Sequence, residues 1–120
     1  MEVSKLPTMI NETQKQTIID KLQIARSFRM RAQGLIGTKV LPNDEGIWFP
    51  NSNWIHTMFM SMSIDVIYLD KNMKVKKLQE NLKPWKFPAP VLSARSVLET
   101  NAGFIEKNNI QLGDQLNVGD

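Results

Sequence analysis

The segment Ile64–Leu69 constrains the fold most strongly, because it is short and almost entirely apolar. Its only charged residue is Asp65, and the others are isoleucine, valine, tyrosine and leucine, which are typical of strands. An apolar run of this length favours a strand that is buried on both faces. A turn at residues 70–73 and a returning segment at 74–79 follow it, so the sequence predicts a β-hairpin built on a central strand.

Other short apolar segments, separated by turn-forming residues, extend this prediction to the whole chain. Further strands are expected at 17–25, 47–49, 96–100 and 115–118, with short helices at 28–33, after a Ser27 N-cap, and at 102–108. Residues 84–90 hold three prolines and are expected to form a loop. We therefore expect an α+β fold that is mainly β, with a small curled or barrel-like sheet of about five to seven strands and two short helices.

The length of 120 residues, with 42% hydrophobic residues, indicates one globular domain. Residues 1–16 are polar and without clear period, so we expect a flexible arm or edge strand there and the single domain at 17–120. No apolar run is long enough to span a membrane. The first residues lack the apolar core of a signal peptide, so the protein is expected to be cytoplasmic unless a signal was removed earlier.

Composition also excludes several kinds of site. The chain has no cysteine, which excludes disulfides, zinc–thiolate sites, iron–sulfur clusters and thiol nucleophiles. It has one histidine and no glycine-rich phosphate loop, so we expect neither a catalytic zinc ion nor a cofactor.

The single histidine, His56, lies in a segment that invites two chemical hypotheses. In an extended strand, Trp54, His56 and Met60 would share one face with two further methionines, and such a face could hold Cu(I). The alternative is that the methionines fill the core. His56 could also transfer protons with Asp65 or Glu99, although nine residues separate it from Asp65, which places the two on opposite faces of a continuous strand.

Asp65 and Glu99 stand among apolar strand residues, where a carboxylate is costly unless it is paired. Arg31 and Arg95 are the expected partners, in ion pairs that fix the strand register. Alternatively, the carboxylates are polar groups at the mouth of a pocket lined by the tryptophans Trp48 and Trp54.

Residues 83–87 read Lys-Pro-Trp-Lys-Phe and alternate cations with aromatic rings, a pattern that can stack bases and hold phosphates. The run is short, and the net charge of the chain is only +3. Trp85 and Phe87 could equally cap an open end of the sheet. We therefore do not expect nucleic acid as a partner.

The order of motifs resembles the bacterial and archaeal domain-of-unknown-function family 192. The matching pieces span about residues 17–118 and are 31–35, 41–49, 64–70, 97–99, 102–103 and 113–114. The resemblance implies a small, mainly β single domain without an established activity. The chain looks like the branch in which a Trp-Ile-His-Thr run precedes the methionine. That branch carries methionine firmly only at the position of Met60, which favours core packing over metal binding.

The sequence as a whole predicts a small binding or accessory domain with a ligand pocket. The residues expected at this pocket are Trp54, His56, Met60 and Trp85, supported by Arg31 with Asp65 or Glu99. The alternative is a small hydrolase-like or isomerase-like enzyme that uses His56 with Asp65 or Glu99. The expected partner is a small molecule or a protein, not a membrane, and the chain is expected to be a monomer or a weak oligomer.

Overall fold

The computed structural model describes residues 6–26, 35, 37 and 40–119. Its elements are β1 (Thr8–Asn11), β2 (Gln16–Ile19), β3 (Lys21–Ile24), β4 (Glu45–Pro50), β5 (Ile64–Leu69), β6 (Val75–Leu82), β7 (Ser96–Asn101), α2 (Phe104–Lys107) and β8 (Leu116–Gly119). The prediction of a mainly β chain is confirmed. Within these residues, no helix is long and apolar enough to cross a membrane.

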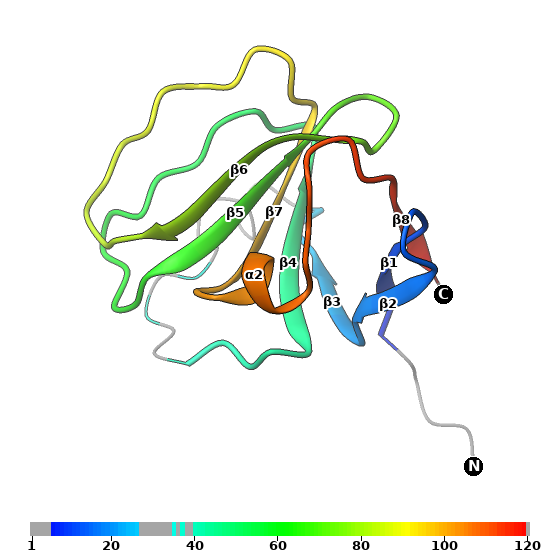
Figure 1. Cartoon of the computed structure of the whole chain (residues 1–120). Coiled ribbons are helices and arrows are strands. Elements are labelled where there is room, and N and C mark those ends of the chain that lie inside the picture. Colours follow the sequence, from blue (N-terminus) through cyan, green and yellow to red (C-terminus); the bar gives the residue numbers. More distant parts are fainter. Residues whose placement is uncertain (1–5, 27–34, 36, 38–39, 120) are drawn as a thin grey trace.

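The strands form two open sheets (Figure 1). A three-stranded antiparallel sheet has the order β2-β1-β8, and a five-stranded sheet has the order β3-β4-β7-β5-β6. In the larger sheet only β3 and β4 run parallel. Its edge strands β3 and β6 do not pair with each other, so the expected barrel-like closure is wrong for the described residues.

Two other parts of the fold prediction need correction. The described residues form eight strands rather than about five to seven, because the segment 17–25 breaks at Asp20 and supplies β2 and β3 to different sheets. They contain one helix, α2, which lies within the segment 102–108 expected to be helical. The other expected helix, at 28–33, lies outside the described residues.

The predicted hairpin is confirmed, and it lies beside β7 in the larger sheet. All six residues of β5 are buried, and the strand pairs with β6 on one side and β7 on the other. At the turn, the Asp70 side chain accepts hydrogen bonds from the backbone N–H groups of Asn72 (2.8 Å) and Lys74 (3.0 Å). These bonds are typical of an aspartate that initiates a tight turn.

Strand β1 lies within the segment that the sequence placed in an arm or edge strand, yet it is the middle strand of the smaller sheet. Met9 and Asn11 of β1 are fully buried. The Asn11 amide donates a 3.0 Å hydrogen bond to the carboxylate of Asp114 just before β8. A buried asparagine that is satisfied this way carries no hydrophobic signal, so the local sequence does not reveal the strand.

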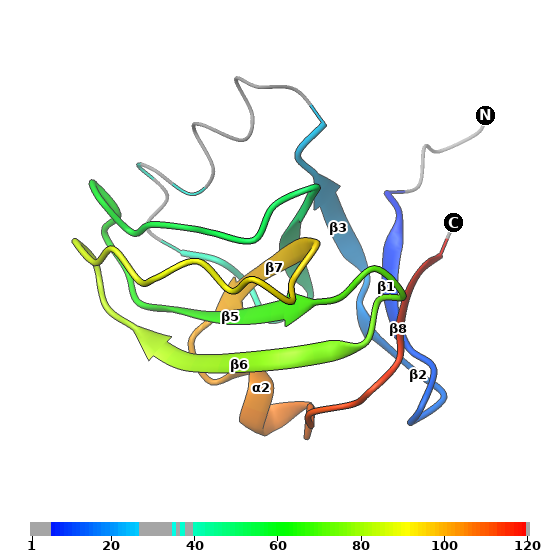
Figure 2. The same cartoon turned by 90° about the horizontal axis from the view of Figure 1, so that it is seen from above.

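The larger sheet has a hydrophobic cluster on each face. One cluster contains Phe104 and Ile105 of α2, and the other contains Ile55 and Met60 from the loop between β4 and β5. Figure 2 shows α2 on one side of the sheet, and the loops 51–63 and 83–95 on the other. These two loops therefore cover one face of the sheet.

Candidate binding surface

The segment around His56 is a loop, so the extended strand on which the Cu(I) hypothesis depended does not form. Its backbone pairs with the proline-rich loop 83–95 instead of joining the sheet. The Thr57 N–H donates to the Lys86 carbonyl (3.0 Å), and the Trp85 N–H donates to the Thr57 carbonyl (2.8 Å). Further along, the Val91 N–H donates to the Asn53 carbonyl (2.9 Å). The two loops therefore form one cross-linked layer.

The side chain of Thr57 connects the same two loops a second time. Its hydroxyl donates to the Lys83 carbonyl (2.6 Å) and accepts from the Lys86 N–H (2.8 Å). Thr57 itself is fully buried, so its hydroxyl has these two groups as its partners. Sequence analysis did not single out Thr57. The only signal was a hydroxyl residue within an otherwise apolar run beside a proline-rich loop, whose backbone groups need partners.

Thr57→Val is expected to lower the free energy of unfolding by about 2 kcal/mol, because two hydrogen bonds that join the loops are lost, each contributing about 1 kcal/mol. Native-state hydrogen exchange should show faster exchange first at the Lys86 amide. Urea unfolding supplies the free energy. Thr57→Ser keeps the hydroxyl and serves as the matched control. Equal stability of the valine and serine variants would contradict this role.

Three rings on the two loops are in mutual contact. The ring centroids of Trp54 and His56 are 5.6 Å apart, those of Trp54 and Phe87 5.8 Å, and those of His56 and Phe87 5.6 Å. The Trp54 indole N–H donates a 2.8 Å hydrogen bond to the Pro88 carbonyl, which fixes its ring against the second loop. We call these three residues the ring cluster.

A second pair of rings lies on the same two loops, with the centroids of Phe59 and Trp85 4.8 Å apart. Both residues have φ of 65°, the left-handed region that bulky residues rarely occupy. This conformation costs about 1–2 kcal/mol per residue relative to the right-handed one. Phe59 is nevertheless 62% exposed and Trp85 56% exposed, so burial of the two rings offsets little of this strain. We call the ring cluster and this pair together the aromatic patch.

The hydrogen bonding of His56 defines its chemistry. Its Nδ1 atom accepts a 3.1 Å hydrogen bond from the Met58 N–H, so Nδ1 carries no proton. The neutral imidazole therefore has its proton on Nε2 and is a hydrogen-bond donor there. No carboxylate among the described residues is hydrogen-bonded to the ring. His56 is thus arranged to donate to a ligand rather than to remove a proton from one.

Two other residues named from the sequence do not lie on the patch. Met60 is buried in the cluster under the loops, as the core-filling alternative expected. Trp48 packs on the opposite face of the sheet, so it does not share a pocket with Trp54. Within the described part of the chain, no three His, Asp or Glu side chains gather into a metal site.

Asp65 holds three parts of the backbone together. One carboxylate oxygen accepts from the Asn81 N–H (2.8 Å), and the other from the N–H groups of Gly103 (3.2 Å) and Ile105 (2.9 Å). Asp65 is fully buried, and the alternation of β5 places it on the same face as α2. The structure therefore separates Asp65 from His56 by the thickness of the sheet.

Glu99 of β7 is on the face that the loops cover, since Val97, two residues before it, packs in that cluster. Its side chain is 4% exposed, and burial raises its pKa to about 8. Burial, and then the Glu99 charge, raise the pKa of Tyr68 on β5 to about 12. The expected Glu99–Arg95 ion pair is wrong, because Arg95 is exposed and donates to the Ala94 carbonyl (3.4 Å). Arg31 lies outside the described residues.

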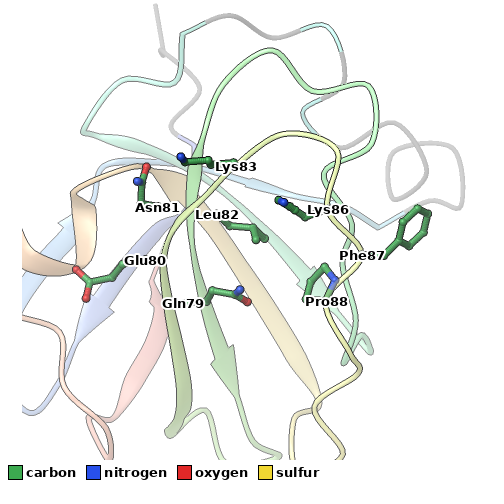
Figure 3. Close-up of a pocket in the computed structure, with 8 residues that line it drawn as sticks. All are labelled: Gln79, Glu80, Asn81, Leu82, Lys83, Lys86, Phe87 and Pro88. Carbon is green, nitrogen blue, oxygen red and sulfur yellow. The ribbon is translucent and has the colours of Figure 1, made fainter.

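Two hollows adjoin the ring cluster. One, of about 480 Å³, is lined by Asn51, Ser52, Asn53, Trp54, Ala94 and Arg95. The other, of about 420 Å³, lies between the end of β6 and the proline-rich loop (Figure 3) and is lined by Gln79, Glu80, Asn81, Leu82, Lys83, Lys86, Phe87 and Pro88. Trp54, which lines the first hollow, stacks on Phe87, which lines the second.

Comparison with known proteins supports the family expected from the sequence. Residues 9–118 match the family model DUF192, which is described as "Uncharacterized ACR". A UPF0127 protein of Pyrococcus furiosus is 35% identical over 115 residues, which cover 90% of this chain and 95% of that protein. A UPF0127 protein of Thermococcus sibiricus is 33% identical over 116 residues, covering 90% of this chain and 72% of that protein.

Two solved bacterial structures are similar in fold. One, from Sinorhizobium meliloti 1021, has a TM-score of 0.80 and 20% sequence identity, and the match covers 98% of both chains. A protein of unknown function from Novosphingobium aromaticivorans has a TM-score of 0.77 and 22% identity, with 98% of this chain and 89% of that one covered. The family model and the archaeal relatives agree, and the chain belongs to domain-of-unknown-function family 192.

Proposed function

We propose that this chain is a small binding domain and that the aromatic patch is its ligand-contacting surface. The observation that carries this proposal is the backbone at Phe59 and Trp85, where two large exposed rings are held at positive φ. Strained backbone conformations that the surrounding structure holds in place are concentrated at functional sites. The Thr57 hydroxyl and the paired loop backbones keep the rings in place before any ligand arrives.

The alternative function is a small enzyme that uses His56 with a carboxylate. Glu99 is the better candidate of the two, since it lies on the face that the loops cover and burial raises its pKa to about 8. The geometry nevertheless favours binding. The Nδ1 lone pair of His56 is occupied by the Met58 N–H, and Asp65 lies on the opposite face of the sheet.

Replacing Phe59 or Trp85 by asparagine is expected to weaken binding without unfolding the domain. Asparagine tolerates the left-handed region, so about 1 kcal/mol of strain is relieved. The lost ring contact costs a similar amount, about 1 kcal/mol, so the free energy of unfolding should change little. Binding should weaken at least about tenfold, because stacking of one ring on a ligand is worth about 1–3 kcal/mol.

The measurement uses three probes and follows tryptophan fluorescence: a chitin hexasaccharide, a proline-rich peptide and a single-stranded oligothymidylate. The matched control is Leu92→Ser, which removes an 83% exposed apolar side chain from the same loop but outside the patch. If every probe binds wild type with a dissociation constant above about 1 mM, the binding function is wrong. It is also wrong if the asparagine variants bind as tightly as Leu92→Ser.

A further inference from the structure

We propose that the aromatic patch binds single-stranded nucleic acid, with bases stacked on the rings and phosphates held in the two hollows. This inference rests on the proposed binding function and adds the class of ligand. It is carried by the charge of the loops and by the order of charged and aromatic groups across the surface.

The two loops carry only positive charge. The segments 51–63 and 83–95 contain no aspartate or glutamate, and their cations are Lys83, Lys86 and Arg95. All three fixed cations are exposed, and none is in an ion pair with a described carboxylate. Exposed cations without acidic neighbours complement an anionic ligand.

The cations and rings follow one another across the surface. Arg95 lines the hollow that ends at Trp54, the rings of Trp54 and Phe87 stack, and Phe87 lines the hollow that holds Lys83 and Lys86. Cations therefore lie on both sides of the rings. A single strand of nucleic acid also alternates, with flat bases and charged phosphate groups. Its bases are unpaired and can stack on the aromatic side chains.

The hollow that is lined by Lys83 and Lys86 is also lined by Gln79. The Oε1 atom of Gln79 is buried and has no hydrogen-bond partner. Figure 3 shows the Gln79 side chain on the inner side of the proline-rich loop, while Phe87 points away from it. The Gln79 oxygen is buried, so the groups of the hollow that are open to a ligand are those of its exposed lining residues, among them Lys83, Lys86 and Phe87. Glu80, which is exposed, lines the same hollow and is its only carboxylate.

These features favour a nucleic acid strand over other partners. An anionic lipid surface would use the cations but has no flat rings to stack on the aromatic side chains. A proline-rich peptide could stack on the rings but has no phosphates for the cations on both sides. The sequence alone did not predict a nucleic-acid partner, because residues 83–87 are only a short run of alternating cations and aromatic rings. The fold adds Trp54, His56 and Phe59 from the other loop.

The test is a titration of the protein with a fluorescent single strand of about twelve nucleotides of mixed sequence, within the range of known single-strand sites. Phe87→Ala should weaken binding about tenfold to a hundredfold, the value of stacking on one base. Three phosphate contacts predict that log Kobs falls with log salt concentration with a slope of about −2. Lys83→Gln with Lys86→Gln should reduce this slope to about −0.7. The double variant Lys71→Gln with Lys107→Gln, which removes two charges elsewhere, should leave it unchanged.

Duplex of the same sequence, a proline-rich peptide and vesicles of phosphatidylserine and phosphatidylcholine complete the experiment. Single-strand binding at least about tenfold tighter than duplex binding is expected, because duplex bases are already stacked. The inference is overturned if duplex binds as well, if Phe87→Ala binds like wild type, or if both double variants change the slope equally. Binding of the peptide or the vesicles through Phe59 and Trp85, without oligonucleotide binding, would remove this inference but keep the proposed function.

Discussion

Glu99→Gln is expected to raise the free energy of unfolding at pH 7 by about 3 kcal/mol. In the folded protein, burial raises the pKa of the Glu99 carboxyl from an ordinary 4.5 to about 8. At pH 7 the unfolded chain releases this proton freely while the folded chain keeps it, and each pH unit above 4.5 costs about 1.4 kcal/mol. Glutamine has the shape of the protonated acid and never ionises, so it removes this cost.

The same group gives the wild type a defined pH dependence. Because the folded pKa is raised, the folded state holds the proton more tightly than the unfolded state does. The contribution of Glu99 to stability is therefore fully present below about pH 4.5 and is lost as pH rises toward about 8. Urea unfolding between these values should show a falling wild-type curve that Glu99→Gln flattens. Glu80→Gln, at an exposed position on β6, is the control. If the wild type and Glu99→Gln keep a constant difference across this range, the account is wrong.

Asp65→Ala is expected to lower the free energy of unfolding by about 4 kcal/mol. Its carboxylate accepts hydrogen bonds from the backbone of Asn81, Gly103 and Ile105 in a fully buried site. Hydrogen bonds to a charged group contribute about 1.5–3 kcal/mol each, and buried donors left without a partner add a cost. Chemical unfolding measures the loss. Hydrogen exchange should show the Ile105 amide among the first to lose protection.

Asp65→Asn removes one oxygen acceptor and keeps the volume of the side chain, so it distinguishes the loss of hydrogen bonds from the loss of packing. The amide keeps one oxygen acceptor but places an NH₂ group against backbone donors, so the loss should be nearly as large as for alanine. Asp70→Asn changes an aspartate that also accepts two backbone N–H groups, but in a turn at the surface, and should cost less. A loss below about 1 kcal/mol for Asp65→Ala would show that water or neighbouring groups replace the carboxylate.

The parts of the fold that local pattern determines were predicted from the sequence. The apolar run of β5 and the turn at Asp70 are contiguous signals, and both are where the pattern placed them. Strand β1 was not recognised as a middle strand, because its place depends on β8, more than 100 residues away, and on the buried Asn11–Asp114 hydrogen bond. The expected barrel-like closure was wrong for a similar reason. Whether the edge strands β3 and β6 pair depends on contacts between distant segments, which no local pattern reports.

The candidate surface was found only in part. Trp54, His56 and Trp85 were named from their residue types, and the structure places them on paired loops. Phe59 and Thr57 were missed, because their roles arise from a left-handed turn and from a bond to the other loop. Neither property leaves a pattern of hydrophobicity or spacing. Whether the surface binds a ligand stays a prediction for the titrations above.

The two hydrogen bonds of the Thr57 hydroxyl, to Lys83 and Lys86, affect how the aromatic patch moves. Loops joined through one buried hydroxyl open together, as one cooperative unit, rather than independently. The rings then lose little conformational entropy when a ligand arrives, so association should be fast and limited by encounter. A ligand that contacts one loop alone should also slow hydrogen exchange in the other.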